Sequence, residues 1–177
     1  YVMSGGNEYV DGDPNLMDRL YINNGNAVFN KFPANLPSTN GGSISSADFN
    51  NDGYPDLFIG SRSIPGGYGL SPISIIVKST PDTDSYFEVV AQSSLGMVTD
   101  SKYADINNDG IDEILTSGFV PGIQNQQVFI LSYNDDIQNF EIVNTFSTAP
   151  DDIPWPGAVI GEWRYGDING DGLEDLF

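Results

Sequence analysis

The sequence predicts an all-β protein, a β-propeller segment of about three four-stranded antiparallel blades, and three observations support this prediction. Acidic loops of nearly identical sequence begin at Asp48, Asp105 and Asp167, so they recur after 57 and 62 residues. Each loop leads directly into a short apolar run, and no stretch shows the apolar stripe of an amphipathic helix. Four short strands in about 60 residues, repeated in tandem, are typical of propeller blades.

The first part of the chain predicts an incomplete blade. The segment "RLYINNGNAVFNKF" (19–32) contains two apolar runs around Asn-Gly, a dipeptide that favours a tight hairpin turn. The segment "SISSADF" (43–49) then predicts a short strand that enters the first acidic loop.

The next two repeats contain apolar and β-branched runs between Gly, Pro, Asp and Asn clusters, which predict strands. In the first of these repeats the runs are "DLFIGS" (56–61), "ISIIVKS" (73–79) and "YFEVVAQ" (86–92). In the second they are "EILTSG" (113–118), "QVFILSY" (127–133) and "NFEIVNTF" (139–146). A further short strand is expected just before each acidic loop.

The phase of the repeat predicts the blade boundaries. Phe58, Leu115 and Phe177 occupy the same place after their loops, and Tyr1 lies 57 residues before Phe58. We therefore expect three repeats cut from a longer protein. A parallel β-helix has shorter coils, and a sandwich would not explain the common phase. The predicted units are a partial blade (1–42), two blades (43–99 and 100–157) and the start of another (158–177).

Composition restricts the chemistry that the chain can perform. Its 177 residues are 39% hydrophobic, enough for a core, and carry a net charge of −19. Such a surface repels nucleic acid and anionic membranes, and cations are its natural small partners. The absence of Cys and His excludes thiolate and imidazole ligands, disulfides and His-based triads. No apolar run approaches the ~20 residues of a membrane helix, so we expect no direct membrane insertion.

The acidic loops have the ligand spacing of the first part of an EF-hand loop. In "DFNNDGYPD" (48–56), oxygen atoms recur at positions 1, 3, 5, 7 and 9, and a glycine at position 6 permits a sharp turn. Hard oxygen ligands in this number suit Ca²⁺ better than Mg²⁺ or Zn²⁺. The predicted ligands are the side chains of Asp48, Asn50, Asp52 and Asp56 and the carbonyl of Tyr54.

The other two loops repeat this spacing, so up to three Ca²⁺ ions are predicted. In the alternative interpretation, the "NDG" and "GDG" segments are tight turns with solvated acids. Three loops at one phase of the repeat favour the calcium interpretation. The acids at position 8, Asp112 and Glu174, are expected to point away from the metal. The second set is Asp105, Asn107, Asp109, the Ile111 carbonyl and Glu113, and the third is Asp167, Asn169, Asp171, the Leu173 carbonyl and Asp175.

The loops and the strands beside them resemble a known repeat. "SADFNNDGYPDLFIGSR", "YADINNDGIDEILTSG" and "YGDINGDGLEDLF" resemble FG-GAP or VCBS repeats, the blades of integrin α-subunit heads and of many bacterial surface proteins. This resemblance implies a Ca²⁺-binding propeller, commonly of seven blades. More narrowly, "SGGNEY", "DRLYINNGN" and "LGMVTDSKYADINNDG" resemble bacterial proteins related to cartilage acidic protein, which often carry an additional ASPIC/UnbV module. That module is not in this chain.

No residue pattern predicts catalysis, so no catalytic residue is assigned. The pairs Asp135–Asp136 and Asp151–Asp152 could serve as the acid and base of a glycosidase, but they fall in predicted turns. Trp155 and Trp163 could stack on a sugar, although aromatic residues of propellers more often fill gaps between blades.

Three functions from different classes remain open at this point. The first is a non-catalytic, calcium-binding module of a secreted or surface protein, acting in adhesion or in protein or glycan binding. The second is part of a propeller enzyme that acts on polysaccharide, and the third is a structural subunit of an extracellular assembly. Calcium sites of extracellular modules have Kd values of about 10⁻⁴–10⁻³ M, so we expect an extracellular, cell-surface or periplasmic location. The expected partners are the rest of the propeller and another protein or a glycan.

Overall fold

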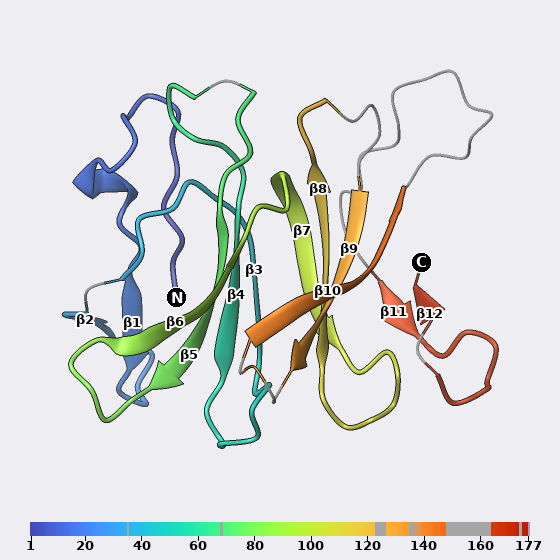
Figure 1. Cartoon of the computed structure of the whole chain (residues 1–177). Helices are drawn as coiled ribbons and strands as arrows, with labels where there is room; N and C mark the ends of the chain where they lie inside the picture. The colour runs from blue at the N-terminus through green and yellow to red at the C-terminus, as the bar shows by residue number, and fades with distance from the viewer. Residues whose placement is uncertain are drawn as a thin grey trace.

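Figure 1 shows the fold of the chain, in which antiparallel sheets stand side by side. Two of the sheets contain four strands each, and the other two contain two strands each. The all-β prediction is therefore confirmed, and the four-stranded sheets are consistent with propeller blades. This computed structural model describes residues 1–34, 36–67, 69–122, 127–134, 137, 139–147, 164–173 and 175–176.

The first four-stranded sheet has the strand order β3-β4-β5-β6, which is also the order along the chain. All of its neighbouring strands are antiparallel. The bounds lie within two residues of the predicted runs. The strands are β3 (Gly41–Ala47), β4 (Asp56–Ser61), β5 (Ser74–Thr80) and β6 (Tyr86–Ser93).

The second four-stranded sheet repeats this arrangement with the order β10-β9-β8-β7. Its strands are β7 (Met97–Ala104), β8 (Glu113–Phe119), β9 (Gln127–Asn134) and β10 (Asn139–Ser147). Both sheets carry a bulge in the first strand, at Gly42 and Thr99, and another in the fourth strand, at Val90 and Val143. Bulges bend a strand locally, so their equivalent positions give the two sheets the same shape.

Shorter sheets flank these two on either side. On the N-terminal side, β1 (Leu20–Asn23) pairs with β2 (Phe29–Phe32), and Val2 bridges to Arg19. On the C-terminal side, β11 (Tyr165–Gly166) pairs with β12 (Asp175–Leu176).

The chain also contains a short helical turn, which is compatible with its all-β class. The 3-10 helix η1 (Pro14–Leu16) is capped by Asp13, whose carboxylate accepts a hydrogen bond of 2.8 Å from the Asn15 amide. Proline in the first position has a backbone angle that suits a helix and lacks an amide that would need a partner. A single turn needs only these local signals, which a search for an apolar periodicity does not detect.

The core lies between the sheets, and it explains why β4 is buried along its whole length. Leu57 and Ile59 point to one face of β4 and join a cluster with Ile75, Val77 and the half-buried Tyr1. Phe58 points to the other face and packs with residues of the second four-stranded sheet. Successive side chains of a strand alternate between faces, so β4 is covered from both sides.

Two glycines allow the four-stranded sheets to approach closely. A Cβ atom on Gly42 would lie 2.2 Å from the Val98 carbonyl oxygen, and one on Gly60 would lie 2.4 Å from the Val98 side chain. Ser43 on β3 is also hydrogen-bonded to Ser101 on β7 over 2.8 Å. Strand β7 therefore meets β3 at Gly42 and β4 at Gly60 without space for side chains at these two points.

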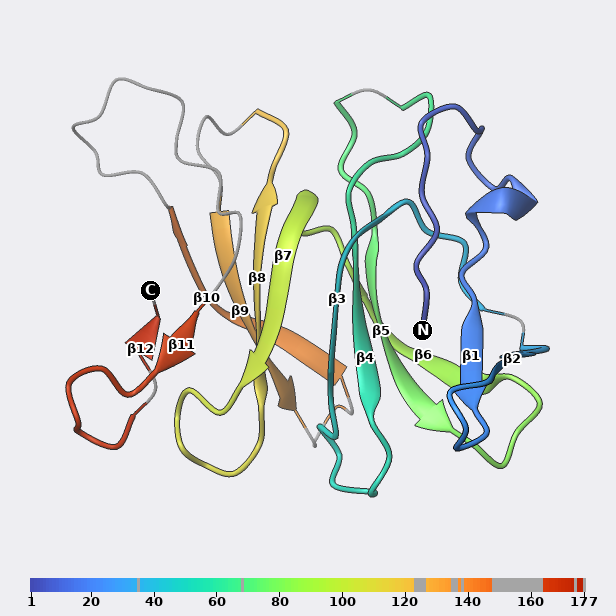
Figure 2. The same ribbon diagram turned by 180° about the vertical axis from the view of Figure 1, so that it is seen from behind.

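The acidic loops share one edge of this arrangement. Figures 1 and 2 show the loops between β3 and β4, β7 and β8, and β11 and β12 along the lower edge of the molecule. The segments that follow β4 and β8 lie at the opposite, upper edge. The acidic loops, which lie at the same phase of the sequence repeat, therefore lie at equivalent places in their sheets.

Candidate metal centre

The backbone of each acidic loop makes the turn that the glycine at position 6 predicts. Gly53, Gly110 and Gly172 have φ angles of 88°, 89° and 87°, in the left-handed region that residues with a Cβ atom seldom adopt. Position 4 is left-handed as well, and asparagine or glycine occupies it in all three loops.

The same hydrogen bonds hold the three loops. The carboxylate at position 1 accepts from the backbone amides of positions 5 and 6, which in the first loop are Asp52 at 3.0 Å and Gly53 at 2.8 Å from Asp48. The amide oxygen at position 3 accepts from the amide of position 5, and the carboxylate at position 5 accepts from that of position 7. The equivalent bonds recur in the loops that begin at Asp105 and Asp167.

In the first loop the carboxylate at position 9 is buried, and only one of its two oxygens accepts a hydrogen bond. Asp56 is fully buried, and its Oδ1 atom accepts a hydrogen bond of 2.8 Å from the Ser79 amide. Its Oδ2 atom is buried and has no hydrogen-bond partner. Burial raises the pKa of Asp56 to about 6, and the charges of Asp52 and Asp48 contribute to the increase.

The second loop has a glutamate at this position, and both of its oxygens are bonded. Glu113 Oε2 accepts a hydrogen bond of 3.1 Å from the Ile106 amide, and Oε1 accepts one of 3.1 Å from the Ser132 hydroxyl. The Asn107 amide group also donates to Oε1, over 3.3 Å. Burial raises the pKa of Glu113, and the hydrogen bonds from Ile106 and Ser132 oppose that increase.

In the third loop, position 9 is Asp175, which is half-buried, and its Oδ2 atom accepts from the Ile168 amide at 3.1 Å.

A lysine distinguishes the carboxylate at position 5 of the first loop. Lys78 Nζ lies 3.5 Å from Asp52 Oδ2 in a partly exposed ion pair. In the other two loops the corresponding Oδ2 atom accepts from the asparagine at position 3, over 2.9 Å and 3.0 Å. The equivalent Asn50 Nδ2 atom is instead buried without a partner.

The described carboxylates are not gathered as they would be around an ion. Among the residues that the structure describes, no group of three or more Asp or Glu side chains is arranged so that it could hold a metal ion. The carboxylates of the first loop are directed apart, toward backbone amides, Lys78 and Ser79. The residues nevertheless suit Ca²⁺ chemically, since every side chain is a hard oxygen donor and Asp56 Oδ2 is a buried oxygen without a partner.

The remaining predicted residues lie mostly at the surface. Tyr54 and Leu173, whose carbonyls are predicted ligands, have exposed side chains, and Ile111 and Asp112 are half-buried. Burial and the charge of Asp105 raise the pKa of Asp112. Other predicted residues fall outside the described part of the chain: Glu174, Asp135–Asp136, Asp151–Asp152, Trp155 and Trp163.

Residues of the third strand of each sheet contact positions 5 and 9 of the loops, and the sequence did not predict them. Ser79, Ser132 and Lys78 belong to the third strand of each sheet, and strand pairing brings them to the loops. Tyr103 on β7 is buried, and its hydroxyl has no hydrogen-bond partner. Burial raises the pKa of Tyr103, and so do the charges of Asp56 and Asp112. No local motif marks these positions.

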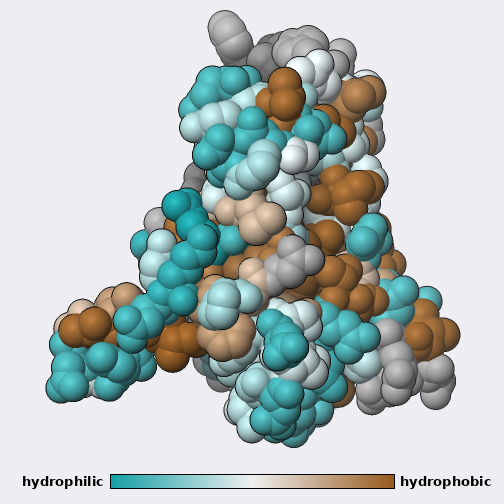
Figure 3. All heavy atoms as spheres, turned by 90° about the vertical axis from the view of Figure 1, so that its left-hand side faces the viewer, coloured by the Kyte–Doolittle hydropathy of each residue, from teal (hydrophilic) through white to brown (hydrophobic). Residues whose placement is uncertain are grey.

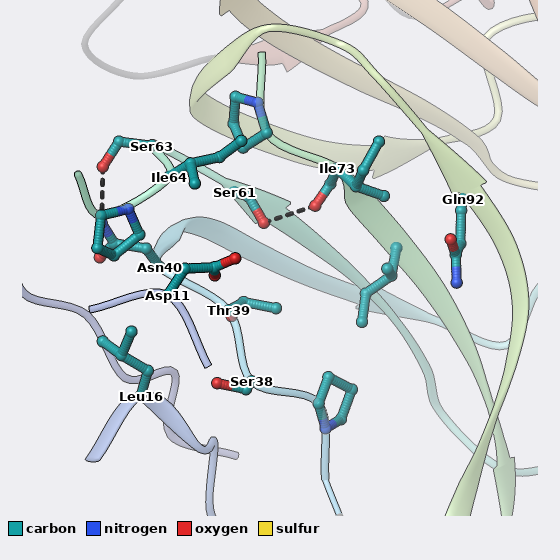
Figure 4. Close-up of a pocket in the computed structure, with 14 residues that line it drawn as sticks. Asp11, Leu16, Ser38, Thr39, Asn40, Ser61, Ser63, Ile64, Ile73 and Gln92 are labelled. Atoms are coloured by element: carbon teal, nitrogen blue, oxygen red, sulfur yellow. Dashed lines mark hydrogen bonds between the residues drawn. The ribbon is translucent and has the colours of Figure 1, made fainter. Parts of the chain in front are cut away.

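A cavity of about 290 Å³ lies at the upper edge, away from the loops. Figure 4 shows Asp11, Thr39, Asn40, Ser61 and Ser63 around it. Their polar groups are largely bonded to one another or to the backbone: Ser61 Oγ donates to the Ile73 carbonyl over 2.7 Å, and Asn40 Nδ2 donates to Ser63 Oγ over 2.6 Å. Asp11 is the one acid among the described lining residues, so they do not form an acid–base pair of carboxylates.

Comparison with protein families finds an FG-GAP-like repeat over residues 3–59. The match spans the β1–β2 hairpin, β3, the first acidic loop and the start of β4. No curated protein matches the chain significantly. The predicted repeat is therefore found in this part of the chain, while the narrower relation to cartilage acidic protein stays a prediction.

Proposed function

We propose that this propeller module binds calcium through its acidic loops and acts, without catalysis, as an adhesion or binding module of an exported protein. The observation that carries the proposal is the repetition of one oxygen-rich loop at equivalent places in three sheets. The buried, unbonded Asp56 Oδ2 in the first of these loops supports it. Ca²⁺ would supply positive charge to this oxygen and to the carboxylates beside it, which otherwise repel one another.

In this proposal each acidic loop holds one ion. Side chains at positions 1, 3, 5 and 9 and the carbonyl at position 7 would hold the ion, as in the first part of an EF-hand loop. In the first loop, Asp52 would exchange its ion pair with Lys78 for the metal. Such sites are weak, so calcium occupancy requires an exported location.

A binding role rests on the surface that the sheets leave uncovered. Figure 3 shows the face on the side of β1 and β2, where apolar side chains lie between hydrophilic ones. Phe29 on β2 is 60% exposed. Elsewhere, on β10 of the second four-stranded sheet, Val143 is 58% exposed. Exposed apolar surface of this kind is consistent with cover by further blades or by another protein or a glycan. In the described part of the chain, no helix is long and apolar enough to cross a membrane.

Calcium loading and thermal unfolding test this proposal together. We expect bound calcium by elemental analysis and a higher melting temperature in millimolar Ca²⁺ than in chelator. Each site would contribute about 2.7 kcal/mol at a hundredfold excess of calcium over its Kd. Asp52→Ala should empty the first site, and Asn50→Asp should retain it, because only the first change removes an oxygen ligand. An unchanged melting temperature without bound calcium would mean that the loops are only turns.

A further inference from the structure

A second and larger cavity opens at the upper edge, between the two four-stranded sheets. It has a volume of about 610 Å³, within the range of about 300–1,000 Å³ that is usual for small-molecule sites. One side is formed by residues of the segment after β4, namely Arg62, Ser63, Ile64, Gly66, Gly67 and Gly69. The other side is formed by Met97, where β7 begins, and Phe119, where β8 ends. The acidic loops lie at the other ends of these strands, so this cavity is separate from them.

The walls of the cavity are mainly apolar and partly fixed by hydrogen bonds. Ile64, Met97 and Phe119 line it together with three glycines. The Gly67 amide donates to the Ile64 carbonyl over 2.8 Å, which closes a turn in the wall. The Arg62 amide donates to the Asn40 carbonyl over 2.8 Å and anchors the start of the segment.

Arg62 is the one charged residue among the described residues that line this cavity. Its side chain is exposed, and no hydrogen bond or ion pair within the described part of the chain engages its guanidinium group. An arginine without an acidic partner is unexpected in a chain with 25 acidic and 6 basic residues. The cavity of Figure 4 has the opposite character, because its charged lining residue is Asp11.

We infer that this cavity binds a small organic carboxylate that has an apolar body. The planar guanidinium of Arg62 presents paired donors that match a carboxylate. Ile64, Met97 and Phe119 would pack against the body of the ligand. The net charge of −19 opposes a second negative charge, so a phosphate or sulfate suits this mainly apolar wall less well. A neutral apolar molecule would remove water from the guanidinium group without supplying a negative partner, which is unfavourable.

Calorimetric titration with 3-phenylpropionate tests the inference, with two analogues that separate charge from apolar body. 3-Phenylpropanamide keeps the body without the charge, and acetate keeps the charge without the body. We expect 3-phenylpropionate to bind at least tenfold more tightly than either analogue. Equal affinity for the amide, or no binding of 3-phenylpropionate up to about 10 mM, would overturn the inference.

Matched variants then locate the site. Arg62→Gln should weaken 3-phenylpropionate binding at least tenfold and leave the amide unaffected, and Ile64→Ser should weaken both. Lys31→Gln removes the same charge from β2, away from the cavity, and should leave all affinities unchanged. Circular dichroism checks that each variant is folded, and Arg62→Lys, which keeps the charge, should retain part of the binding. Unchanged affinity in Arg62→Gln, or equal losses in Lys31→Gln, would show that the cavity is not the site.

Discussion

The first and second acidic loops share one backbone turn and the same hydrogen bonds to backbone amides at positions 5 to 7. They differ in the partners of the buried carboxylate at position 9. Asp56 leaves one oxygen without a partner, whereas both oxygens of Glu113 are bonded. Strand register places Lys78 and Ser132 at equivalent positions, beside Val77 and Leu131. Lys78 pairs with the acid at position 5, and Ser132 donates to the acid at position 9.

The two loops therefore differ in the carboxylate at position 9 and in the residue that the third strand places beside it. Glu113 accepts from the Ile106 amide, whereas Asp56 accepts from the Ser79 amide. In the third loop Asp175 accepts from the equivalent Ile168 amide, so an aspartate at position 9 can also make this bond. The second loop thus satisfies its buried charge internally, while the first keeps an oxygen free for a cation. We expect the first loop to depend more on calcium than the second.

The largest expected effect is the loss of the internally bonded carboxylate. Glu113→Ala should destabilise the protein by about 3 kcal/mol in chelator, because the Ile106 amide and the Ser132 hydroxyl lose their acceptor. Glu113→Gln is the matched control and should cost less, since it keeps one acceptor oxygen. Chemical denaturation in chelator measures both. A Glu113→Ala variant as stable as the wild type would contradict the comparison.

A smaller effect of opposite sign, an increase in stability in chelator, is expected when Asp56 is replaced by asparagine. Its folded pKa of about 6 lies above the ordinary value of 3.8, so in chelator its contribution to stability is lost as the pH rises from about 4 through 6. Asp56→Asn should therefore stabilise the calcium-free protein at pH 8, on the order of 1–2 kcal/mol. The difference should shrink at pH 4 and reverse in millimolar Ca²⁺. Denaturation at both pH values, with and without Ca²⁺, checks this, and the prediction fails if the variant is less stable than the wild type in chelator at pH 8.

Replacing Asp56 and Lys78 by the residues at the equivalent positions of the second loop should give the first loop the hydrogen bonds of the second. The double variant Asp56→Glu/Lys78→Ser supplies the longer carboxylate and the hydroxyl, and it frees Asp52 to accept from Asn50. In chelator it should be more stable than the wild type by about 1 kcal/mol, because buried polar groups gain partners. Its stabilisation by Ca²⁺ should fall correspondingly. Reduced stability in chelator would mean that packing around Asp56 has no room for the extra methylene.

The smallest effect is expected for the ion pair alone. Lys78→Gln removes a partly exposed pair, so the free energy of unfolding should change by less than about 0.5 kcal/mol. Calcium affinity of the first loop should rise about twofold, because Asp52 loses a competing partner. Lys102→Gln on β7 controls for the general change in charge. Isothermal titration with Ca²⁺ compares the two variants, and equal affinities would show that Lys78 does not compete.

The sequence by itself determined the all-β class, most strand positions and the three acidic loops, because these follow from local signals. Short apolar runs define strands such as β4, and asparagine and glycine at positions 4 and 6 define the turns. The hydrogen bonds among positions 1 to 7 of each loop join residues at most five apart, so they depend on local sequence.

Only the tertiary structure decided how each buried carboxylate is partnered. Ser79 lies 23 residues from Asp56, and Ser132 lies 19 residues from Glu113, so strand register and not local sequence brings each pair together. The arginine-lined cavity likewise combines the segment after β4 with the ends of β7 and β8. Contacts between separate strands depend on pairing register and on the close approach at Gly42 and Gly60, neither of which leaves a local pattern in the chain.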